Sequence, residues 1–329
     1  MKKVSRLLLE YYLYEYIINP LRIVVSNRKS CAGLVLLLGF VALAIYGAFI
    51  HVDLTTHPDR AFIPPTIIRL ITGVKSSVPW WKYPLGTDWK GRDILGMLAK
   101  GAAPLLEASL CAGLITVVVG MCVGLTAGYL GGFADRALMW VTDVFLNIPS
   151  LPLYVLIGVL MLKAQMQFNP FLVAAVVSVT AWAGIARAIR SQVLALKTQP
   201  FVELARSLGM PTAHIVFREI LPNVAGYIAI NFIFSTTGAI YAITGLFFLG
   251  ALPINPTQWG VMLNDAWKNV FIFGPGLYYL VEVILALALL QVSFVLLSYG
   301  LDEIFNPRIR ERYFKSAAAK LLEARKALR

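Results

Sequence analysis

The chain has 329 residues, of which 59% are hydrophobic and only 14% are charged. Soluble domains carry about 25% charged residues. This composition and apolar runs of about 20 residues or more therefore exclude a soluble protein and indicate one that crosses the membrane several times. The net charge of +12 would also suit nucleic-acid binding, but basic residues gather on the cytoplasmic side of membrane proteins, and we favour that explanation.

Residues 1–30 form a basic, aromatic leader. Its apolar residues would lie along one side of a helix that ends at Pro20, which predicts an interfacial helix; a plain cytoplasmic tail is the alternative. The first long apolar run starts only at Cys31, and no small-residue cleavage site follows it, which argues against a signal peptide. The chain's three cysteines have neither metal-site spacing nor a disulfide pattern.

Six apolar segments predict six transmembrane helices, and hence an all-α membrane protein with both termini on the same side. The predicted spans are residues 31–50, 105–130, 137–162, 168–189, 224–249 and 277–301. A loop over residues 51–102 follows the first span. The other five spans form a core over residues 103–303, and a basic tail over residues 304–329 ends the chain.

Local features refine three of these segments. Glycines in the second span recur at intervals of four, which lets a neighbouring helix approach closely: Gly120, Gly124 and Gly128. Pro149 and Pro152 should break the third span. The 51–102 loop contains three tryptophans, which are typical of a membrane surface: Trp80, Trp81 and Trp89.

Basic residues predict which side is cytoplasmic. With both termini inside, the leader, the turn at Arg136, the segment 187–218 and the tail from Arg308 hold 20 of the 29 Lys and Arg residues. Most of the others lie in the long loop after the first span, and long loops bear weakly on orientation. We therefore expect a cell-membrane protein with cytoplasmic termini and a cytoplasmic segment between the fourth and fifth spans.

That segment, residues 193–223, is polar and basic although two apolar spans flank it. Good helix formers run up to Gly209, where Pro211 predicts a helix stop. Thr212 could cap a second short helix, closed by Pro222. A solvated loop would not need the apolar residues found here, so we favour a docking surface for another protein. Those residues are Leu204, Ala205, Leu208, Ile215, Val216 and Ile220.

The stretch ELARSLGMPTAHIVFREILPN resembles the EAA motif of permease subunits in ATP-binding-cassette (ABC) importers. Its motif residues are Glu203, Ala205, Gly209, Leu221, Pro222 and Asn223. Two positions depart from the family pattern, since Leu204 replaces an alanine and Glu219 replaces a common histidine. The resemblance implies a coupling helix that fits a groove on a partner ATPase. Arg206, three residues after Glu203, could pair with it or with a charge on that partner.

Five further stretches narrow the resemblance to the second permease of dipeptide, oligopeptide and nickel uptake systems. They are PLGTDWKGRDILGMLAKGA (84–102), GGFADRALMWVTDVFLNIPSLPLYV (131–155), WAGIARAIRSQVLALK (182–197), GLFFLGALPINPTQWGVMLNDA (245–266) and LDEIFNPRIR (301–310). The resemblance as a whole covers nearly all of residues 28–310, and these motifs follow one another in the family's order, which makes the match specific. A glutamate that is common in this subfamily is replaced by Ile243.

The resemblance implies a type I ABC importer permease fold with a cytoplasmic coupling helix. The expected partners are a homologous permease, two ATP-binding subunits and an extracytoplasmic solute-binding protein, and transport would proceed by alternating access. The chain has no GxxxxGK[ST] phosphate loop, so we expect no ATPase site and no cofactor of its own; ATP and Mg would bind the partner subunits. Peptides are the expected substrates, and oligosaccharides or nickel chelates are the alternatives.

A second candidate site lies in the TDWKGRD stretch of the 51–102 loop. Its residues are Gly86, Thr87, Asp88, Gly91, Arg92 and Asp93. We favour a local ion-paired loop, because surface ion pairs are common and contribute little. Contact with the binding protein or gating of the outer mouth is the alternative.

The fifth span carries polar and small residues along one face: Asn231, Ser235, Gly238, Ala242 and Gly245. Close helix packing and lining of a translocation pathway both fit this face. Tyr241 and Glu282 are further pathway candidates. Ionisable groups inside spans are functional candidates by default, and Asp143 lies near enough to Arg136 and Arg187 for an interfacial network.

Two other classes of function compete with transport. A membrane-embedded enzyme would need convergent His, Asp and Ser groups inside the spans, and the sequence offers none, so we expect no catalytic or metal site. A structural or channel-like membrane subunit would leave the 193–223 segment unexplained.

Overall fold

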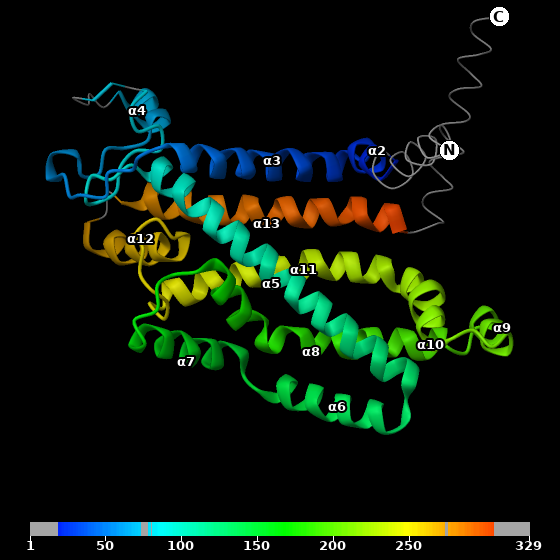
Figure 1. Cartoon of the computed structure of the whole chain (residues 1–329). Helices are drawn as coiled ribbons and strands as arrows, with labels where there is room; N and C mark the ends of the chain where they lie inside the picture. The colour runs from blue at the N-terminus through cyan, green and yellow to red at the C-terminus, as the bar shows by residue number, and fades with distance from the viewer. Residues whose placement is uncertain (1–18, 74–77, 80, 274–275, 306–329) are drawn as a thin grey trace, which may run out of the picture.

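The computed structural model describes residues 19–73, 78–79, 81–273 and 276–305. Over these ranges the chain is helical, and its only β pairing is an isolated bridge between Thr87 and Asp93. The helices form an elongated bundle (Figure 1) with α9 (Pro200–Ser207) at one end and α12 (Trp259–Phe273) at the other. We call these the α9 end and the α12 end.

Five helices are long and apolar enough to cross a membrane. They are α3 (Arg28–Phe49), α5 (Ile94–Leu130), α8 (Pro170–Leu196), the continuous helix Thr212–Phe248, and α13 (Leu277–Phe305). The pair α6 (Gly132–Asn147) and α7 (Ser150–Lys163), bent by 81°, makes a sixth crossing if it counts as one span. On that count the six predicted spans are confirmed in number and order, although some helices extend beyond the predicted bounds.

The break in the third span falls where it was predicted. Ile148 precedes Pro149 and is extended, at φ −77° and ψ 123°. The ring of a proline disfavours the helical conformation in the residue before it, so α6 ends there. Pro152 lies in the first turn of α7, where a missing backbone N–H costs nothing.

Helix α5 lies at the centre of the bundle and packs along α8. The predicted close approach at its glycines is confirmed: a Cβ added at Gly124 would lie 2.6 Å from the carbonyl oxygen of Ala186. One added at Gly128 would lie 2.7 Å from the Cβ of Val193. Small residues thus let the two backbones meet.

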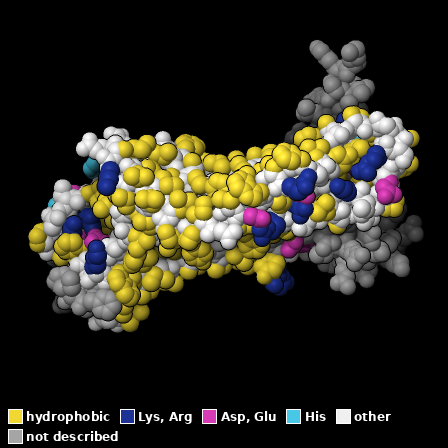
Figure 2. Space-filling view, turned by 90° about the horizontal axis from the view of Figure 1, so that it is seen from below, with side chains coloured by type: hydrophobic (Ala, Val, Ile, Leu, Met, Phe, Trp, Pro, Cys, Tyr) yellow, Lys and Arg dark blue, Asp and Glu magenta, His cyan; other side chains and the backbone are white. Residues whose placement is uncertain are grey.

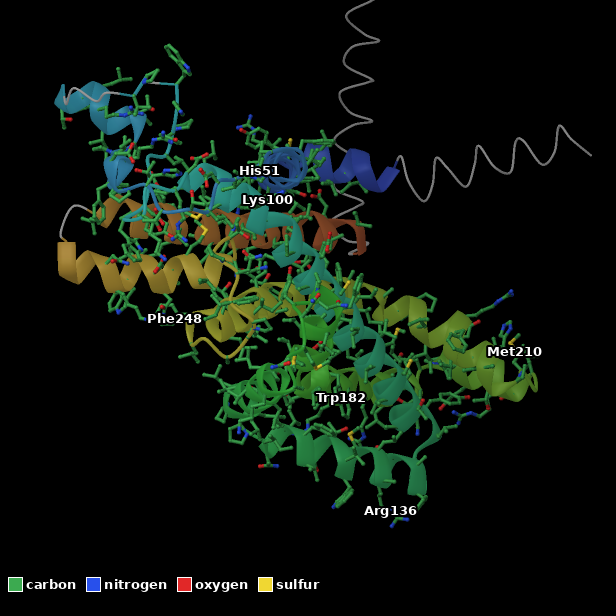
Figure 3. All side chains as sticks on the ribbon, turned by 60° about the vertical axis from the view of Figure 1, so that its left-hand side comes forward. His51, Lys100, Arg136, Trp182, Met210 and Phe248 are labelled. Carbon is green, nitrogen blue, oxygen red and sulfur yellow. The ribbon has the colours of Figure 1, made fainter. Side chains whose placement is uncertain are left out.

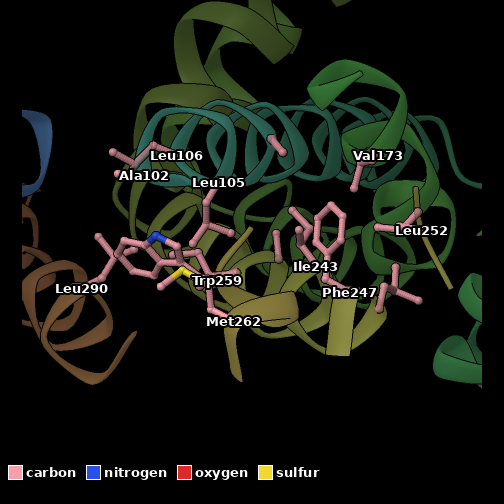
Figure 4. Close-up of a cluster of buried hydrophobic side chains, with 14 of the residues drawn as sticks. Ala102, Leu105, Leu106, Val173, Ile243, Phe247, Leu252, Trp259, Met262 and Leu290 are labelled. Carbon is pink, nitrogen blue, oxygen red and sulfur yellow. The ribbon is translucent and has the colours of Figure 1, made fainter. Parts of the chain in front are cut away.

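The larger apolar core lies between α5, α8, α11 (Leu221–Phe248), α12 and α13 (Figure 4). Trp259 is buried in this core, and its Nε1 donates a hydrogen bond to the Leu98 carbonyl oxygen at 2.9 Å. Ile243 is buried in the same core. The position where the resemblance leads us to expect a glutamate is therefore an apolar packing position here.

Several expectations about the loops were wrong. Helix α12 fills much of residues 250–276, between the fifth and sixth predicted spans, and α5 begins at Ile94 rather than near residue 105. A short helix, α4 (Thr66–Thr72), lies in the 51–102 loop. Pro20 lies in the first turn of α2 (Asn19–Ser26). The predicted leader helix before it, Trp80 and most of the basic tail lie outside the described residues.

The surface agrees with a membrane protein. Seen from below, hydrophobic side chains cover most of the central stretch of the molecule, and Lys, Arg, Asp and Glu lie mainly toward its two ends (Figure 2). A water-soluble protein would not expose such a continuous apolar band.

Candidate functional site

The predicted docking segment forms a compact unit at the α9 end. We call it the knuckle, residues 200–220: α9, α10 (Thr212–His214) and the π-helical turn η3 (Ile215–Ile220). Helix α8 continues to Leu196, and a short turn separates it from the first helix of the knuckle, which begins at Pro200. In Figure 3 Met210 marks the tip of the knuckle, at the opposite end of the molecule from Phe248.

Gly209 stops α9 as predicted. It has a left-handed backbone (φ +72°), and the N–H of Met210 donates to the Ala205 carbonyl oxygen at 3.1 Å. This six-to-one hydrogen bond after a left-handed glycine is a Schellman motif, which satisfies carbonyls left open at a helix end. No heavy atom would lie within 4 Å of an added Cβ there, so the backbone angle alone favours glycine.

Two details of the second helix were predicted wrongly. Thr212 does not cap it, because Pro211 occupies the cap position and no side chain caps the helix. Pro222 does not close it, because the helix runs on into α11. The π-helical turn explains this continuity: the Leu221 N–H bonds to Val216 five residues back, and Pro222 lies where hydrogen bonding returns to the α pattern.

The knuckle has a buried face and an exposed face. The buried face packs against α5 and α8 with Val202, Ala205, Ile215 and Ile220. The exposed face carries Leu204 (61% exposed), Leu208 (66% exposed) and Phe217. Of the six apolar residues that predicted a docking surface, Leu204 and Leu208 are exposed. The others pack wholly or partly against the bundle and hold the knuckle in place.

The charged motif residues of the knuckle are also exposed. Glu203 and Arg206 form no ion pair with each other within the described part of the chain. Asn223 uses its side-chain amide to donate to the Glu219 carbonyl oxygen at 2.6 Å. Glu203 and Arg206 therefore remain available for charges on another protein, as the sequence suggested.

Two ion pairs hold α6 against α8. Arg190 binds Asp135 through two hydrogen bonds, one of them 2.6 Å from Nη2 to Oδ2, and Arg187 pairs with Asp143. Thr142 is the one buried residue of α6, and the Phe145 ring packs edge-on against Trp182 of α8 with the ring centres 5.3 Å apart. We call these two pairs the clasp. The predicted network at Asp143 is confirmed for Arg187.

A cleft of about 530 Å³ opens beside the break between α6 and α7. Its walls are Thr116, Phe145, Leu146, Ile148, Ser150, Tyr154, Val177, Thr180, Ala181, Gly184, Phe234, Ser235, Gly238, Ala239 and Ala242. None of these residues is charged. The hydroxyl of Tyr154 donates to the Val177 carbonyl oxygen at 2.7 Å and lies 2.7 Å from Thr180 Oγ1, which fixes the ring in the wall.

The cleft gathers some of the predicted pathway residues. Ser235 and Gly238 line it, as does Ala242. Asn231 does not; its side-chain amide donates to the Tyr227 carbonyl oxygen at 2.8 Å. Tyr241 is exposed elsewhere on α11, and Glu282 lies in α13.

The sequence missed the contributions of α5, α7 and α8 to this cleft. Thr116, Tyr154 and Thr180 lie in apolar runs as single hydroxyls, which give no signal of their own. The sequence predicted the bend at Pro149, but it did not show which helices the bend would face.

The TDWKGRD stretch folds around a buried ion cluster at the α12 end. Arg92 (3% exposed) donates from Nε to Asp88 Oδ2 at 2.7 Å and from Nη2 to Asp265 Oδ2 of α12 at 2.8 Å. Trp89 Nε1 also donates to Asp265, at 3.2 Å. We call Asp88, Arg92 and Asp265 the Arg92 cluster. The expected ion-paired loop is present, but it is buried and joins two segments instead of lying on the surface.

The rest of the motif builds the loop around this cluster. Thr87 and Gly86 are buried, and the Tyr278 hydroxyl donates to the Thr87 carbonyl oxygen at 2.8 Å. Gly91 has φ +77°, and a Cβ there would lie 2.3 Å from the His57 carbonyl oxygen. Asp93 caps α5 by accepting from the Gly96 N–H at 3.1 Å. With Asp88 fully buried, the motif offers little charged surface for another protein.

Burial and polar contacts act in opposite directions on the pKa values of Arg92 and Asp93. Burial disfavours the Arg92 guanidinium, but hydrogen bonding and attraction from Asp88 outweigh it and raise the pKa of Arg92. Burial raises the pKa of Asp93, and hydrogen bonds from the Gly96 and Leu95 backbone only partly offset it. Arg92 therefore stays charged, with Asp88 and Asp265 balancing its charge, whereas burial makes the charged form of Asp93 unfavourable.

Comparison with known proteins places this geometry in a family. The chain is 29% identical to the dipeptide transport system permease protein DppC of Bacillus subtilis, over 87% of this chain and 83% of that protein. It is 30% identical to the oligopeptide transport system permease protein OppC of Haemophilus influenzae, over 86% of each chain. It is 33% identical to the glutathione transport system permease protein GsiD of Pectobacterium atrosepticum, over 71% of this chain and 74% of that protein.

A solved structure of the MetNI methionine ABC transporter also aligns, with a TM-score of 0.49 and 17% identity over 62% of this chain and 96% of the MetNI chain. The family model for the inner membrane component of binding-protein-dependent transport systems matches residues 120–311. This match spans the knuckle, the clasp and most of the cleft. The chain is thus a multi-pass membrane protein of the family of binding-protein-dependent transport system inner membrane components, the permease subunits of ABC importers.

Proposed function

We propose that this permease subunit imports dipeptides and oligopeptides by alternating access, driven by partner ATPases that dock on the knuckle. The knuckle carries the proposal: a two-faced element whose inner face is part of the core and whose outer face presents Leu204 and Leu208 beside Glu203 and Arg206. Apolar side chains at the tip of a polar element suit a groove on another protein.

The orientation follows from the same element. The α9 end, with the knuckle and the basic residues Arg187, Arg190 and Arg206, lies on the cytoplasmic side, where ATPases work. The α12 end then faces the solute-binding protein, and a homologous permease completes the pathway. ATP and Mg act in the partner ATPases and not in this chain.

Peptides are the substrates that the relatives favour. The three relatives above are named for dipeptide, oligopeptide and glutathione transport, not for oligosaccharides or nickel chelates. The uncharged wall of the cleft, with the hydroxyls of Ser150 and Ser235, suits peptides whose side chains differ in charge. A fixed charge in the wall would favour some peptides and repel others.

The clasp supplies a route for force from the knuckle to the cleft. Helix α8 leads to α9 through a short turn, and Arg187 and Arg190 near its end hold α6. Directly after Asp143, the C-terminal turn of α6 forms a wall of the cleft with Phe145 and Leu146. Displacement of the knuckle by an ATPase therefore moves the cleft wall, which is a rigid-body form of alternating access.

The test is a reconstituted complex of this chain with its partner permease, ATPases and binding protein. Leu204→Asp and Leu208→Asp place charges on the exposed face without disturbing the buried one. We expect ATP-dependent peptide uptake to fall at least about tenfold, the effect of about 1.4 kcal/mol lost at a docking site. Insertion and thermal stability should be unchanged.

The control is Arg136→Ala, at an exposed position on α6 near the same end of the molecule (Figure 3). Uptake that survives both aspartates at the rate of the control would rule out the knuckle as the ATPase contact. Uptake of solutes without ATPases would instead identify a channel-like subunit.

A further inference from the structure

The break in the third span leaves the first turn of α7 with open backbone donors. Pro149 occupies the cap position without a side-chain cap, and the Leu153 N–H bonds back to its carbonyl oxygen at 3.3 Å. Pro152 has no N–H, so the open donors are the N–H groups of Ser150 and Leu151, which have no backbone partner in the described part of the chain. The start of a helix carries a partial positive charge and binds anions.

The place of this helix end in the fold gives its open donors a meaning. In Figure 1 the bend between α6 and α7 lies in the middle part of the bundle, away from the α9 end and the α12 end. Unpaired backbone groups at membrane depth are tolerated where they are buried in protein or line a water-filled cavity. The cleft of about 530 Å³ is such a cavity, and Ile148, Ser150 and Tyr154 belong to its wall.

The carbonyl end of α6 meets the same bend but points in another direction. Carbonyl groups point along the axis of α6, and N–H groups point back along the axis of α7. Because the two helices are bent by 81°, the two sets of groups are directed almost at right angles to each other. No charged side chain lines the cleft to offset the start of α7. Its positive end therefore acts on whatever enters the cleft.

A buried hydroxyl in the same wall also lacks a partner. Thr116 of α5 is 2% exposed and lines the cleft, and its hydroxyl forms no hydrogen bond within the described residues. Thr126 of the same helix, in contrast, donates to the Cys122 carbonyl oxygen at 2.7 Å. Nearly all buried polar groups have a partner, so an unpaired hydroxyl that borders a cavity points to a polar group bound there.

We propose that the start of α7 and the Thr116 hydroxyl bind the terminal carboxylate of a peptide in the cleft. This inference rests on the proposed function and adds a chemical preference to it. The carboxylate accepts hydrogen bonds from the Ser150 and Leu151 N–H groups and from Thr116, and the rest of the uncharged wall leaves the peptide's side chains unselected.

The experiment compares uptake of trialanine with that of trialanine amide, which lacks the terminal charge. The complete transporter is reconstituted in proteoliposomes, and the initial rate of ATP-dependent uptake is measured for each peptide with saturating binding protein. The ratio of the acid rate to the amide rate in a variant is divided by the wild-type ratio, which removes any preference of the binding protein itself.

Ser150→Asp places a competing carboxylate at the start of α7, where an acid suits the helix. We expect it to lower the acid-to-amide ratio at least about fivefold, the factor that corresponds to about 1 kcal/mol. Ser150→Asn is the matched neutral variant and should leave the ratio within about twofold of the wild type. Equal ratios in the two variants would overturn the proposal, because no carboxylate would then bind at α7.

Thr116→Val removes the unpaired hydroxyl and should lower the acid-to-amide ratio at least about threefold. Thr116→Ser should restore the ratio, and Thr126→Val, the same change outside the cleft wall, should leave it unchanged. Equal loss of both peptides in Thr116→Val would show a packing role and overturn the assignment of Thr116. A wild-type transporter that imports neither peptide would instead refute the proposed function, and this inference would fall with it.

Discussion

The two ends of this permease use charge and apolar surface in opposite ways. At the α12 end, Asp88 and Arg92 are buried and bind one another and Asp265. At the α9 end, Glu203 and Arg206 are exposed and unpaired with each other, and Leu204 and Leu208 face outward. The charged motif is thus an internal brace, and the motif with the exposed apolar tip is the contact surface that we propose for the ATPase.

This difference shows why a charged signature is poor evidence for a surface. Buried ions persist only when they are paired and hydrogen-bonded, so a sequence with two acids around one arginine can describe an interior. Exposed leucines that lie together on a short polar helix are instead typical of an interaction site. The following changes test this contrast, from the largest expected effect to the smallest.

Arg92→Ala should cost the most stability. The change leaves Asp88 buried without its countercharge and breaks the ion pair that links Asp265 of α12 to the loop. Breaking a buried ion pair costs about 3–5 kcal/mol. Thermal unfolding of the purified protein would measure the loss. The control is Arg60→Ala, whose partner Asp59 is exposed at 3.3 Å and whose loss should cost about 0–1 kcal/mol. Equal effects of the two changes would show that the Arg92 cluster is no brace.

Ile215→Ala should weaken the packing of the knuckle against the bundle. Its side chain is fully buried against α5 and α8, and such truncations cost about 2–5 kcal/mol. Amide hydrogen exchange should accelerate in α9 before it does in the core. Leu204→Ala on the exposed face should change stability by no more than about 0.5 kcal/mol. Faster exchange in the Leu204 variant than in the Ile215 variant would reverse our assignment of the two faces.

Reversing one charge of the clasp should affect transport more than stability. Arg190→Asp places two carboxylates side by side, but the pair is partly exposed, so the free energy of unfolding should fall by about 1 kcal/mol at most. Peptide uptake per ATP hydrolysed should fall several-fold if the clasp transmits force. Adding Asp135→Arg restores an ion pair of reversed sense and should restore uptake. A double variant as poor as the single one would speak against an electrostatic link.

Asp93→Asn should change stability the least, and unlike the other changes it should not lower the free energy of unfolding near neutral pH. Asparagine can still accept from the Gly96 N–H, but it carries no charge to bury. Because the pKa of Asp93 is raised by burial, its stabilising contribution is present at low pH and is lost as the pH rises through that pKa.

Near neutral pH the Asp93→Asn variant should therefore be as stable as the wild type or up to about 1 kcal/mol more stable. Its unfolding temperature should also lack the downward slope with pH that Asp93 contributes. A variant less stable than the wild type at neutral pH, with the slope intact, would contradict this account of burial.

The sequence by itself determined the membrane class, the order of the six crossings, the break at Pro149 and the stop at Gly209. Each of these depends on local chemistry: run length, a proline that removes a donor, a glycine that tolerates a left-handed backbone. The motif that identifies the family is also local, and its match was visible without a structure.

Only the tertiary structure decided which residues of each motif face outward. Leu204 and Ala205 are neighbours in the sequence, yet one is exposed and the other packs against the bundle. Asp88 looked like a surface acid until Asp265, 177 positions further on, proved to share its arginine. Burial and pairing depend on residues far apart in the chain, and periodicity within one segment cannot report them.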